Sequence, residues 1–232
     1  MSQKYVLLRR SLEDKGILLT PEQLEKYHID REKEHFTSLC YYNENHKKLF
    51  DKEKSVAGIK DTVTDKLAFD FDDKTNLENA RQDTLALLKR FKEMKISKDS
   101  VDIYFSGDKG FHVILNLENE LNPEQAKNLA INHFGKGLST LDTSIYNPSR
   151  VFRLSGTKHK SSALYKTPLT FEEISTNDCQ AIREFAKSNR ENTVLRPKKR
   201  FLIPDIIIIN SFNSNSEGDK RHKSSDSSSG ND

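Results

Sequence analysis

The clearest pattern in the chain is a helical repeat between residues 76 and 95. Side chains recur there at steps of three or four, mostly apolar with one threonine: Leu77, Ala80, Thr84, Leu88 and Phe91. This spacing predicts a helix that buries one face. The segment 64–72 before it and the segment 101–105 after it alternate apolar and polar residues, which predicts strands. A strand, a long helix and a strand predict a βαβ unit.

Other segments follow the same criteria. Thr20-Pro21 predicts a helix start, with Thr as the cap and Pro in the first turn. Asn122-Pro123 predicts another, ended by Gly135. Further predicted strands are 5–8, 35–43, 111–117, 150–154, 163–166 and an edge strand at 201–209, and further predicted helices are 44–54, 122–134, 170–173 and 177–187.

The composition excludes several classes of protein. The 232 residues carry 38 Lys and Arg against 35 Asp and Glu, a net charge of +3 that does not by itself indicate nucleic-acid binding. Cys40 and Cys179 are the two cysteines, too few for a cysteine-built zinc site. The longest aliphatic block, 206–209, is too short to span a bilayer, and the N-terminus has no long apolar run. We therefore expect an intracellular protein with no membrane partner.

A glycine-bearing turn is predicted between the strands 101–105 and 111–117. Its sequence is Ser106-Gly107-Asp108-Lys109-Gly110-Phe111-His112. Glycine lets the backbone approach a ligand closely. Ser106, Lys109 and His112 supply a hydroxyl, an ammonium and an imidazole, a set of donors that suits a polyphosphate. The alternative is that the glycines only make the turn.

Three acids are candidates for metal binding. Asp70 and Asp72 lie two apart on a predicted strand, so their carboxylates share a face. Two such carboxylates repel each other unless a cation lies between them, and oxygen ligands suit Mg²⁺ or Mn²⁺. The alternative is a solvated strand end. Asp142 is the third acid, with helix or turn capping as its alternative role.

A basic strand and turn follow. Arg153 shares an otherwise apolar strand, 150–154, and therefore needs an anionic partner or water. Lys158 and His159 are on the next turn, where they could contact phosphates, although a solvated basic turn is the alternative. A basic linker follows at 196–200. No Gly-x-x-x-x-Gly-Lys-Ser/Thr stretch is present, so a helicase, if one is needed, is another polypeptide.

The order of these motifs resembles the catalytic core of the archaeo-eukaryotic primase (AEP) superfamily over roughly residues 60–170. The specific part is the match of Ser106 to His112 to motif II, with Asp70 and Asp72 at the positions of motif I and Asp142 at that of motif III. The stretch 153–159 resembles the family's Arg-Leu-Pro-Gly-Ser-x-His, with Ser155 where proline is frequent. The chain lacks the ligands of the zinc knuckle that some members carry.

The resemblance implies an α/β (α+β) fold, an AEP core with an RRM-like sheet flanked by helices. It implies a catalytic domain, which we place at 1–200. The residues after it predict a possible edge strand at 201–212 and, because they lack apolar anchors, a disordered polar tail at 213–232. It further implies a DNA primase or primase-polymerase that transfers nucleotides by a two-metal mechanism, with a single-stranded DNA template, nucleoside triphosphates and an accessory subunit or helicase as partners. The implied metal ligands are Asp70, Asp72 and Asp142, and the implied nucleotide contacts are Ser106, Lys109, His112, Arg153, Lys158 and His159.

Two alternatives remain open at this point. A repair or gap-filling polymerase of the same superfamily would use the same residues for a different job. A module that binds nucleotides or nucleic acid without catalysis could also use an RRM-like sheet, although such a sheet would favour exposed aromatic residues over paired acids.

Overall fold

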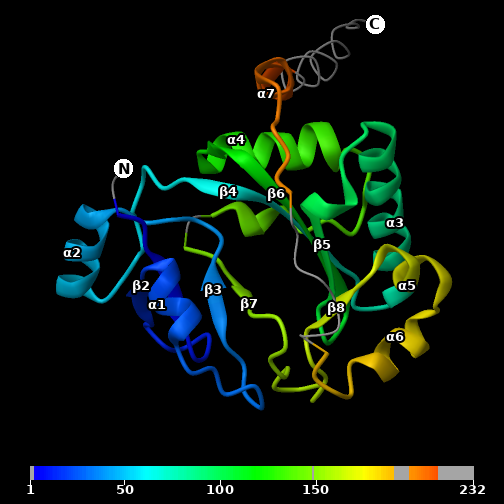
Figure 1. Ribbon diagram of the computed structural model, residues 1–232, viewed down its shortest axis with the longest axis horizontal. Coiled ribbons are helices and arrows are strands. Elements are labelled where there is room, and N and C mark those ends of the chain that lie inside the picture. Colours follow the sequence, from blue (N-terminus) through cyan, green and yellow to red (C-terminus); the bar gives the residue numbers. More distant parts are fainter. Residues whose placement is uncertain (1–2, 148, 191–198, 214–232) are drawn as a thin grey trace, which may run out of the picture.

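The computed structural model describes residues 3–147, 149–190 and 199–213, which contain two four-stranded sheets (Figure 1). Every ladder in both sheets is antiparallel. The first sheet has the order β2-β1-β3-β7 and the second has the order β4-β6-β5-β8. The strands are β1 (Val6–Arg9), β2 (Ile17–Leu19), β3 (Phe36–Ser38), β4 (Thr64–Asp72), β5 (Val101–Phe105), β6 (Gly110–Leu121), β7 (Val151–Arg153) and β8 (Thr167–Leu169).

Helices flank the sheets, so the predicted α/β class is confirmed. The longest is α3 (Leu77–Glu93), within the predicted range 76–95, with Asn76 as its cap. The others are α1 (Pro21–Lys26), α2 (Glu44–Glu53), α4 (Pro123–Asn128), α5 (Phe171–Thr176), α6 (Cys179–Phe185) and α7 (Asp205–Asn213), with 3₁₀ turns η1 (Lys98–Ser100) and η3 (Thr143–Tyr146) and a π-helical turn η2 (Leu129–Phe134). None of the helices in the described part of the chain combines the length and apolarity needed to cross a membrane.

The predicted βαβ unit is present in a split form. Strands β4 and β5 are parallel to each other, but β6 lies between them and pairs antiparallel with both. The tight turn after β5 leads directly into β6, and β6 lies between β5 and β4 in the sheet. Asp70 of β4 and Tyr104 of β5 both pair with His112 of β6. The centre of the second sheet is thus built from the segments that carry the candidate motifs.

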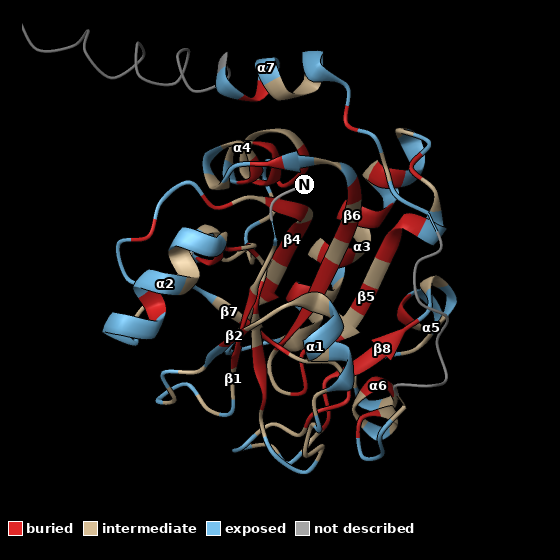
Figure 2. Ribbon diagram, turned by 60° about the vertical axis from the view of Figure 1, so that its left-hand side comes forward, coloured by how far each residue is buried: buried red, intermediate tan, exposed pale blue. Residues whose placement is uncertain are grey.

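Alternation along β4 separates a packed face from a polar face. Phe69 is fully buried and contacts Phe91 of α3 and Phe134 of η2 in edge-on ring pairs. Phe69 and the other apolar odd-numbered residues of β4 belong to the main core between the second sheet and its helices (Figure 2). The even-numbered positions, including Asp70 and Asp72, point to the opposite face, on the side of the first sheet.

The edge strand predicted at 201–209 is wrong. Phe201 makes one parallel bridge to Leu117, and the chain then forms α7 from Asp205. Pro204 precedes the helix, and its carbonyl accepts the N–H groups of Ile207 and Ile208. Packing of these two isoleucines on the main core overrides the strand preference of a β-branched run.

The strand predicted at 163–166 is also misplaced. Ala163 has a positive φ of 57°, and 163–166 make one bridge, between Tyr165 and Lys158. The strand begins at Thr167 and pairs with β5 in the second sheet. The predicted tail from 214 onward and most of the basic linker, 196–198, lie outside the described residues.

The start of α1 allows a direct test of the helix-capping prediction. Thr20 Oγ1 accepts the N–H of Gln23, and the Gln23 side chain accepts the N–H of Thr20. We expect Thr20→Ala to lower the free energy of unfolding by about 1 kcal/mol, because one N–H of the first turn loses its acceptor. Urea unfolding measures this change. Thr20→Ser keeps the acceptor and is expected to stay close to wild type.

Candidate active site

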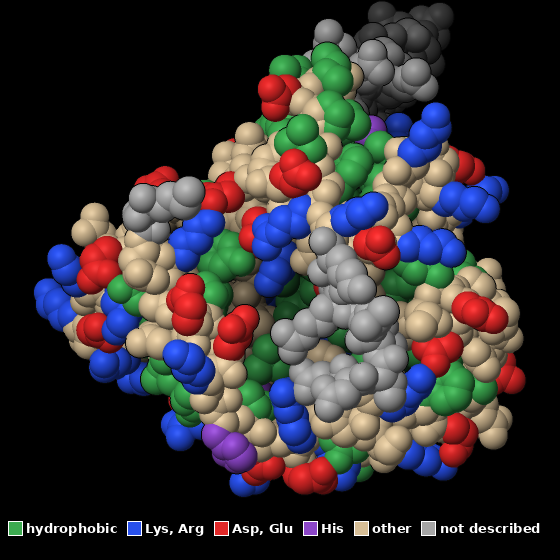
Figure 3. Space-filling view, viewed as in Figure 1, with side chains coloured by type: hydrophobic (Ala, Val, Ile, Leu, Met, Phe, Trp, Pro, Cys, Tyr) green, Lys and Arg blue, Asp and Glu red, His purple; other side chains and the backbone are tan. Residues whose placement is uncertain are grey.

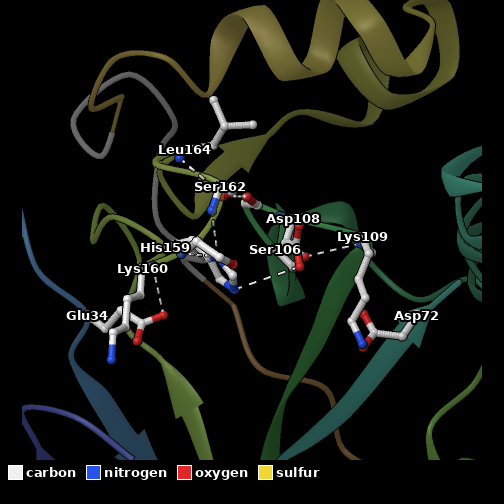
Figure 4. Close-up of polar contacts among 12 residues, drawn as sticks. Glu34, Asp72, Ser106, Asp108, Lys109, His159, Lys160, Ser162 and Leu164 are labelled. Carbon is white, nitrogen blue, oxygen red and sulfur yellow. Dashed lines mark hydrogen bonds and ion pairs between the residues drawn. The ribbon is translucent and has the colours of Figure 1, made fainter. Parts of the chain in front are cut away.

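The two acids of β4 lie against basic side chains from the glycine turn and β6. Asp70 is paired in register with His112, and Asp72 is paired with Gly110. His112 Nε2 lies 3.2 Å from Asp70 Oδ1, and Lys109 Nζ lies 3.0 Å from Asp72 Oδ2. Figure 4 shows the Lys109 ammonium reaching the Asp72 carboxylate. The two acids, Lys109 and His112 therefore meet at one end of one sheet face.

Gly110 makes this close approach possible. A Cβ built on Gly110 would lie 2.0 Å from the Phe71 carbonyl oxygen and 2.3 Å from Asp72 Oδ1. Both distances are far below van der Waals contact. The glycine is therefore required by the space beside β4, and it contributes to the position of the Asp72 carboxylate.

Asp142 lies beside Asp70 through a short backbone pairing. The Asp142 N–H donates to the Asp70 carbonyl at 2.8 Å, and the Asp72 N–H donates to the Thr140 carbonyl at 2.9 Å. This antiparallel pairing puts Leu141 opposite Phe71 and Asp142 opposite Asp70, so both aspartates share a sheet face. The Asp142 carboxylate also caps η3 by accepting the N–H and hydroxyl of Ser144.

Burial and neighbouring charge set the protonation of these groups. Burial, followed by the charge of Asp70, raises the pKa of Asp72. Burial opposes the ionisation of Asp70 as well, but the surrounding positive charges outweigh it and lower its pKa. The hydrogen bond to Asp72 raises the pKa of Lys109, whereas burial lowers that of His112. The repulsion between the two neighbouring carboxylates thus leaves one of them prone to protonation, and a bound cation would relieve that repulsion.

Ser106 and His159 hold the glycine turn in place. Ser106 is buried, and its Oγ accepts the N–H of Gly110 at 3.2 Å. His159 Nε2 lies 3.9 Å from Asp108 Oδ2, and Ser162 Oγ donates to the Gly107 carbonyl (Figure 4). The basic turn after β7 therefore packs against the glycine turn.

Lys158 is not brought to the acids. Its ammonium lies 2.6 Å from Glu32 Oε2, and its backbone N–H donates to the Arg31 carbonyl. Arg153 is buried to 9% exposure, and the nearby acids Glu34, Asp108, Asp70 and Asp72 all raise its pKa. Burial outweighs them and lowers that pKa to about 10.

Lys166 is a residue that the sequence interpretation missed. It is 3% exposed, and its Nζ donates to the Arg153 carbonyl at 2.8 Å. Its charge acts on both Asp70 and His112. The position of this lysine, between Tyr165 and β8, is a signal that the sequence offers. The strand predicted at 163–166 nevertheless implies a lysine side chain exposed to solvent, so its burial was not expected.

Lys166 predicts a pH dependence of stability. Burial, followed by the charge of Arg153, lowers its pKa from 10.5 to about 7. Between these values the unfolded chain binds more protons than the folded one, so stability rises with pH. We expect wild type to gain about 2 kcal/mol relative to Lys166→Met between pH 7 and pH 9. Urea unfolding at several pH values measures this gain, and parallel pH profiles for the two proteins would contradict it.

The acids have the donor type for a divalent cation. Asp70 Oδ1 is buried and has no hydrogen bond of acceptable geometry, which is the environment in which a cation would be stabilising. Within the described residues, no group of three or more His, Cys, Asp or Glu side chains is arranged to bind an ion by itself. An ion here would therefore need water or substrate oxygens to complete its shell.

The site thus combines paired carboxylates, a glycine turn with a basic side chain, and an adjoining basic turn. A scan against protein-family models and a search of the curated proteins gave no match to the chain.

Two solved structures are similar to it. One is the AEP domain of the primase-polymerase of cyanophage S-2L, with 15% identity, 80% of this chain and 89% of that chain covered, and a TM-score of 0.39. The other is the polymerase domain of Mycobacterium tuberculosis ligase D in complex with DNA, with 11% identity, 91% and 82% covered, and a TM-score of 0.45. Because both TM-scores are below 0.5, the function proposed below is derived from the residues of the site.

Proposed function

We propose that the chain is the catalytic domain of a DNA primase or primase-polymerase, which joins nucleotides to a 3′-hydroxyl on a single-stranded DNA template. One observation carries the proposal: Asp70 and Asp72 lie on one sheet face against His112 and Lys109, and Asp142 is paired with Asp70 on the same face. Acids beside phosphate-binding cations are what transfer of a nucleotidyl group requires.

In this proposal Asp70 and Asp72 hold Mg²⁺ or Mn²⁺, with Asp142 completing the site on the side of the hydroxyl. When bound, two such ions would stabilise the negative charge that develops on the attacking and leaving oxygens. Mg²⁺ is commonly bound by one or two carboxylates together with phosphate oxygens of the substrate, which suits the arrangement of donors here.

The basic side chains would exchange partners when substrate binds. In the described state, Lys109 is paired with Asp72 and His112 lies beside Asp70. A cation on the carboxylates would compete with these contacts, leaving Lys109 free to bind the triphosphate. Arg153 and His159 are further candidates for phosphate contacts, and Lys158 would have to leave Glu32 to become one.

The experiment is nucleotide incorporation by the purified protein with Mg²⁺ or Mn²⁺, ribo- or deoxyribonucleoside triphosphates and a single-stranded template. Synthesis of dinucleotides without a primer supports a primase. Extension only of a supplied primer supports the gap-filling alternative, which uses the same residues. No incorporation under any of these conditions would contradict both, and nucleotide affinity unchanged by divalent metal would then favour a binding module.

A further inference from the structure

The helix α7 carries apolar side chains on opposite sides. Ile207 and Ile208 are partly buried against the main core. Ile206, Ile209 and Phe212 point away from it, with exposed fractions of 61, 56 and 37%. Successive residues of a helix are about 100° apart, so these three exposed side chains fall within one arc of about 120°. A helix that is apolar on all sides is normally covered on all sides, whereas in the described part of the chain one side of α7 is open.

This open side forms a patch at the edge of the molecule. Leu202, 58% exposed, lies just before α7 and extends the stripe of Ile206, Ile209 and Phe212; we call these four residues the α7 patch. They are four of the seven exposed large apolar side chains in the described residues. In Figure 1 α7 lies at the top edge of the molecule, and Figure 3 shows hydrophobic side chains gathered over it. A cluster of this kind marks an interaction surface.

Two asparagines fix the direction in which α7 runs over the rest of the chain. The side chain of Asn119, in β6, bonds both the N–H and the carbonyl of Ile203, so α7 starts beside that strand. The side chain of Asn132, in η2, donates to the Ser211 carbonyl at 3.1 Å. The last turn of α7 therefore lies beside η2.

A hollow of about 270 Å³ adjoins this last turn. Asn132 is one of the residues that line it, and Ile131, Leu138 and Leu141 give it an apolar part. Lys136, an exposed residue that follows η2, also lines it. The surface at the end of α7 thus offers an apolar hollow together with a positive charge.

The charges at the two ends of α7 are opposite in sign. Asp205 is the only charged residue of α7 and lies in its first turn, whereas Lys136 lies beside the last turn. Within the described residues neither of them forms an ion pair. A second α7 running antiparallel to the first would place the acidic start of each helix beside the basic hollow at the end of the other. A parallel arrangement would instead bring the two aspartates together.

The sequence favours a second copy of the chain as the partner. Residues 214–232, which follow α7, include no aliphatic or aromatic side chain that could cover the patch. Oligomers of identical chains most often have two-fold symmetry, in which every contact is made twice. The α7 patch, with an apolar stripe, a hollow and one charge of each sign, is complementary to itself in that symmetry.

We propose that the chain forms a two-fold dimer in which the α7 patches of two copies pack antiparallel, with Asp205 of each copy beside Lys136 of the other. A nine-residue helix is about 14 Å long, so the contact is smaller than a standard protein interface and the dimer is weak. The dimer does not depend on the proposed transfer function.

Sedimentation velocity of the chain between about 5 and 500 µM tests the dimer. We expect a dissociation constant on the order of 10⁻⁵ to 10⁻⁴ M. Ile209→Asp should weaken association roughly a hundredfold or more, because it puts a charge at the centre of the buried stripe. Leu12→Asp makes the same kind of change at an exposed leucine elsewhere and should dimerise as wild type does. Circular dichroism checks that both variants are folded.

Charge reversal tests the antiparallel arrangement. Asp205→Lys and Lys136→Asp should each weaken the dimer roughly threefold or more, because each brings like charges together at both ends of the contact. The Asp205→Lys, Lys136→Asp double variant should dimerise as wild type does. A loss caused only by a less stable α7 would not be restored by the change at residue 136.

The proposal is overturned if the chain is still monomeric at about 500 µM, if Ile209→Asp dimerises as wild type does or if the double charge variant stays as weak as the single ones. Flotation with phosphatidylcholine vesicles examines the other possible occupant. A monomeric chain that floats with vesicles, and loses this in Ile209→Asp, would assign the α7 patch to a lipid surface and overturn the dimer. A dimer that incorporates no nucleotide would refute the transfer function alone.

Discussion

Changing Asp70 and Asp72 together to asparagine is expected to reduce nucleotide incorporation by a factor on the order of 10³ or more. Asparagine keeps the size of the side chain but removes the negative charge that would hold the cations. The measurement is the rate of primer extension or dinucleotide synthesis at saturating Mn²⁺. If the double variant keeps a rate close to wild type, the acids are not the metal site and the proposed function is wrong.

The matched control carries the same change of charge elsewhere. Asp51 and Asp99 are both exposed, on α2 and η1, and the double change Asp51→Asn, Asp99→Asn should leave the rate near wild type. The active-site variant should also remain folded. Burial and the charge of Asp70 already disfavour the ionised form of Asp72, so a neutral amide costs the fold little there, whereas Asp70→Asn removes a negative charge that its basic neighbours stabilise, and circular dichroism therefore checks that the double variant is folded.

Gly110→Ala is expected to lower the free energy of unfolding by about 3 kcal/mol or more. The new methyl group would overlap the Phe71 carbonyl oxygen and the Asp72 carboxylate, at 2.0 and 2.3 Å. The carbonyl belongs to β4 and can move only if the β4–β6 pairing moves with it, and such overpacking strain is large. Urea unfolding measures the loss, and the activity of any folded fraction should fall because the Asp72 carboxylate is displaced.

Gly58→Ala separates steric overlap from the general cost of replacing a glycine. Gly58 has a positive φ of 77°, and nothing lies within 4 Å of a Cβ built on it. Its replacement should therefore cost only about 1 kcal/mol, from backbone strain. If Gly110→Ala is no more destabilising than Gly58→Ala, the space beside β4 is not as restricted as the structure indicates.

Local pattern was sufficient to predict the two strands on either side of α3. Alternation along β4 put Asp70 and Asp72 on one face, and the bounds of that strand and of β5 agree with the predicted ranges. The hairpin after β5 fixes the pairing of Tyr104 with His112, because strand register follows from the turn, whereas the pairing of His112 with Asp70 depends on how β6 meets β4.

Features that depend on long-range packing could not be predicted in this way. The sequence left Asp142 open to a capping role or a metal-binding role. In the structure it caps η3 and also lies on the same sheet face as Asp70. Its position beside Asp70 follows from the pairing of 140–142 with β4, which the sequence does not disclose. The burial of Lys166 depends on how the first sheet packs over the second. The helix α7 depends on the burial of Ile207 and Ile208, which their β-branched sequence does not disclose.

Strand β7 has a practical consequence for dissecting the protein. It lies between the third acid and the basic turn in sequence, yet its hydrogen-bonded neighbour is β3, more than a hundred residues earlier. Expressing only the motif-bearing span from about 60 to 170 would strip β7 of that neighbour and leave Arg153 without its framework. A shortened chain that keeps β7 in its sheet must therefore begin ahead of Phe36, because β3 supplies the strand with which β7 pairs.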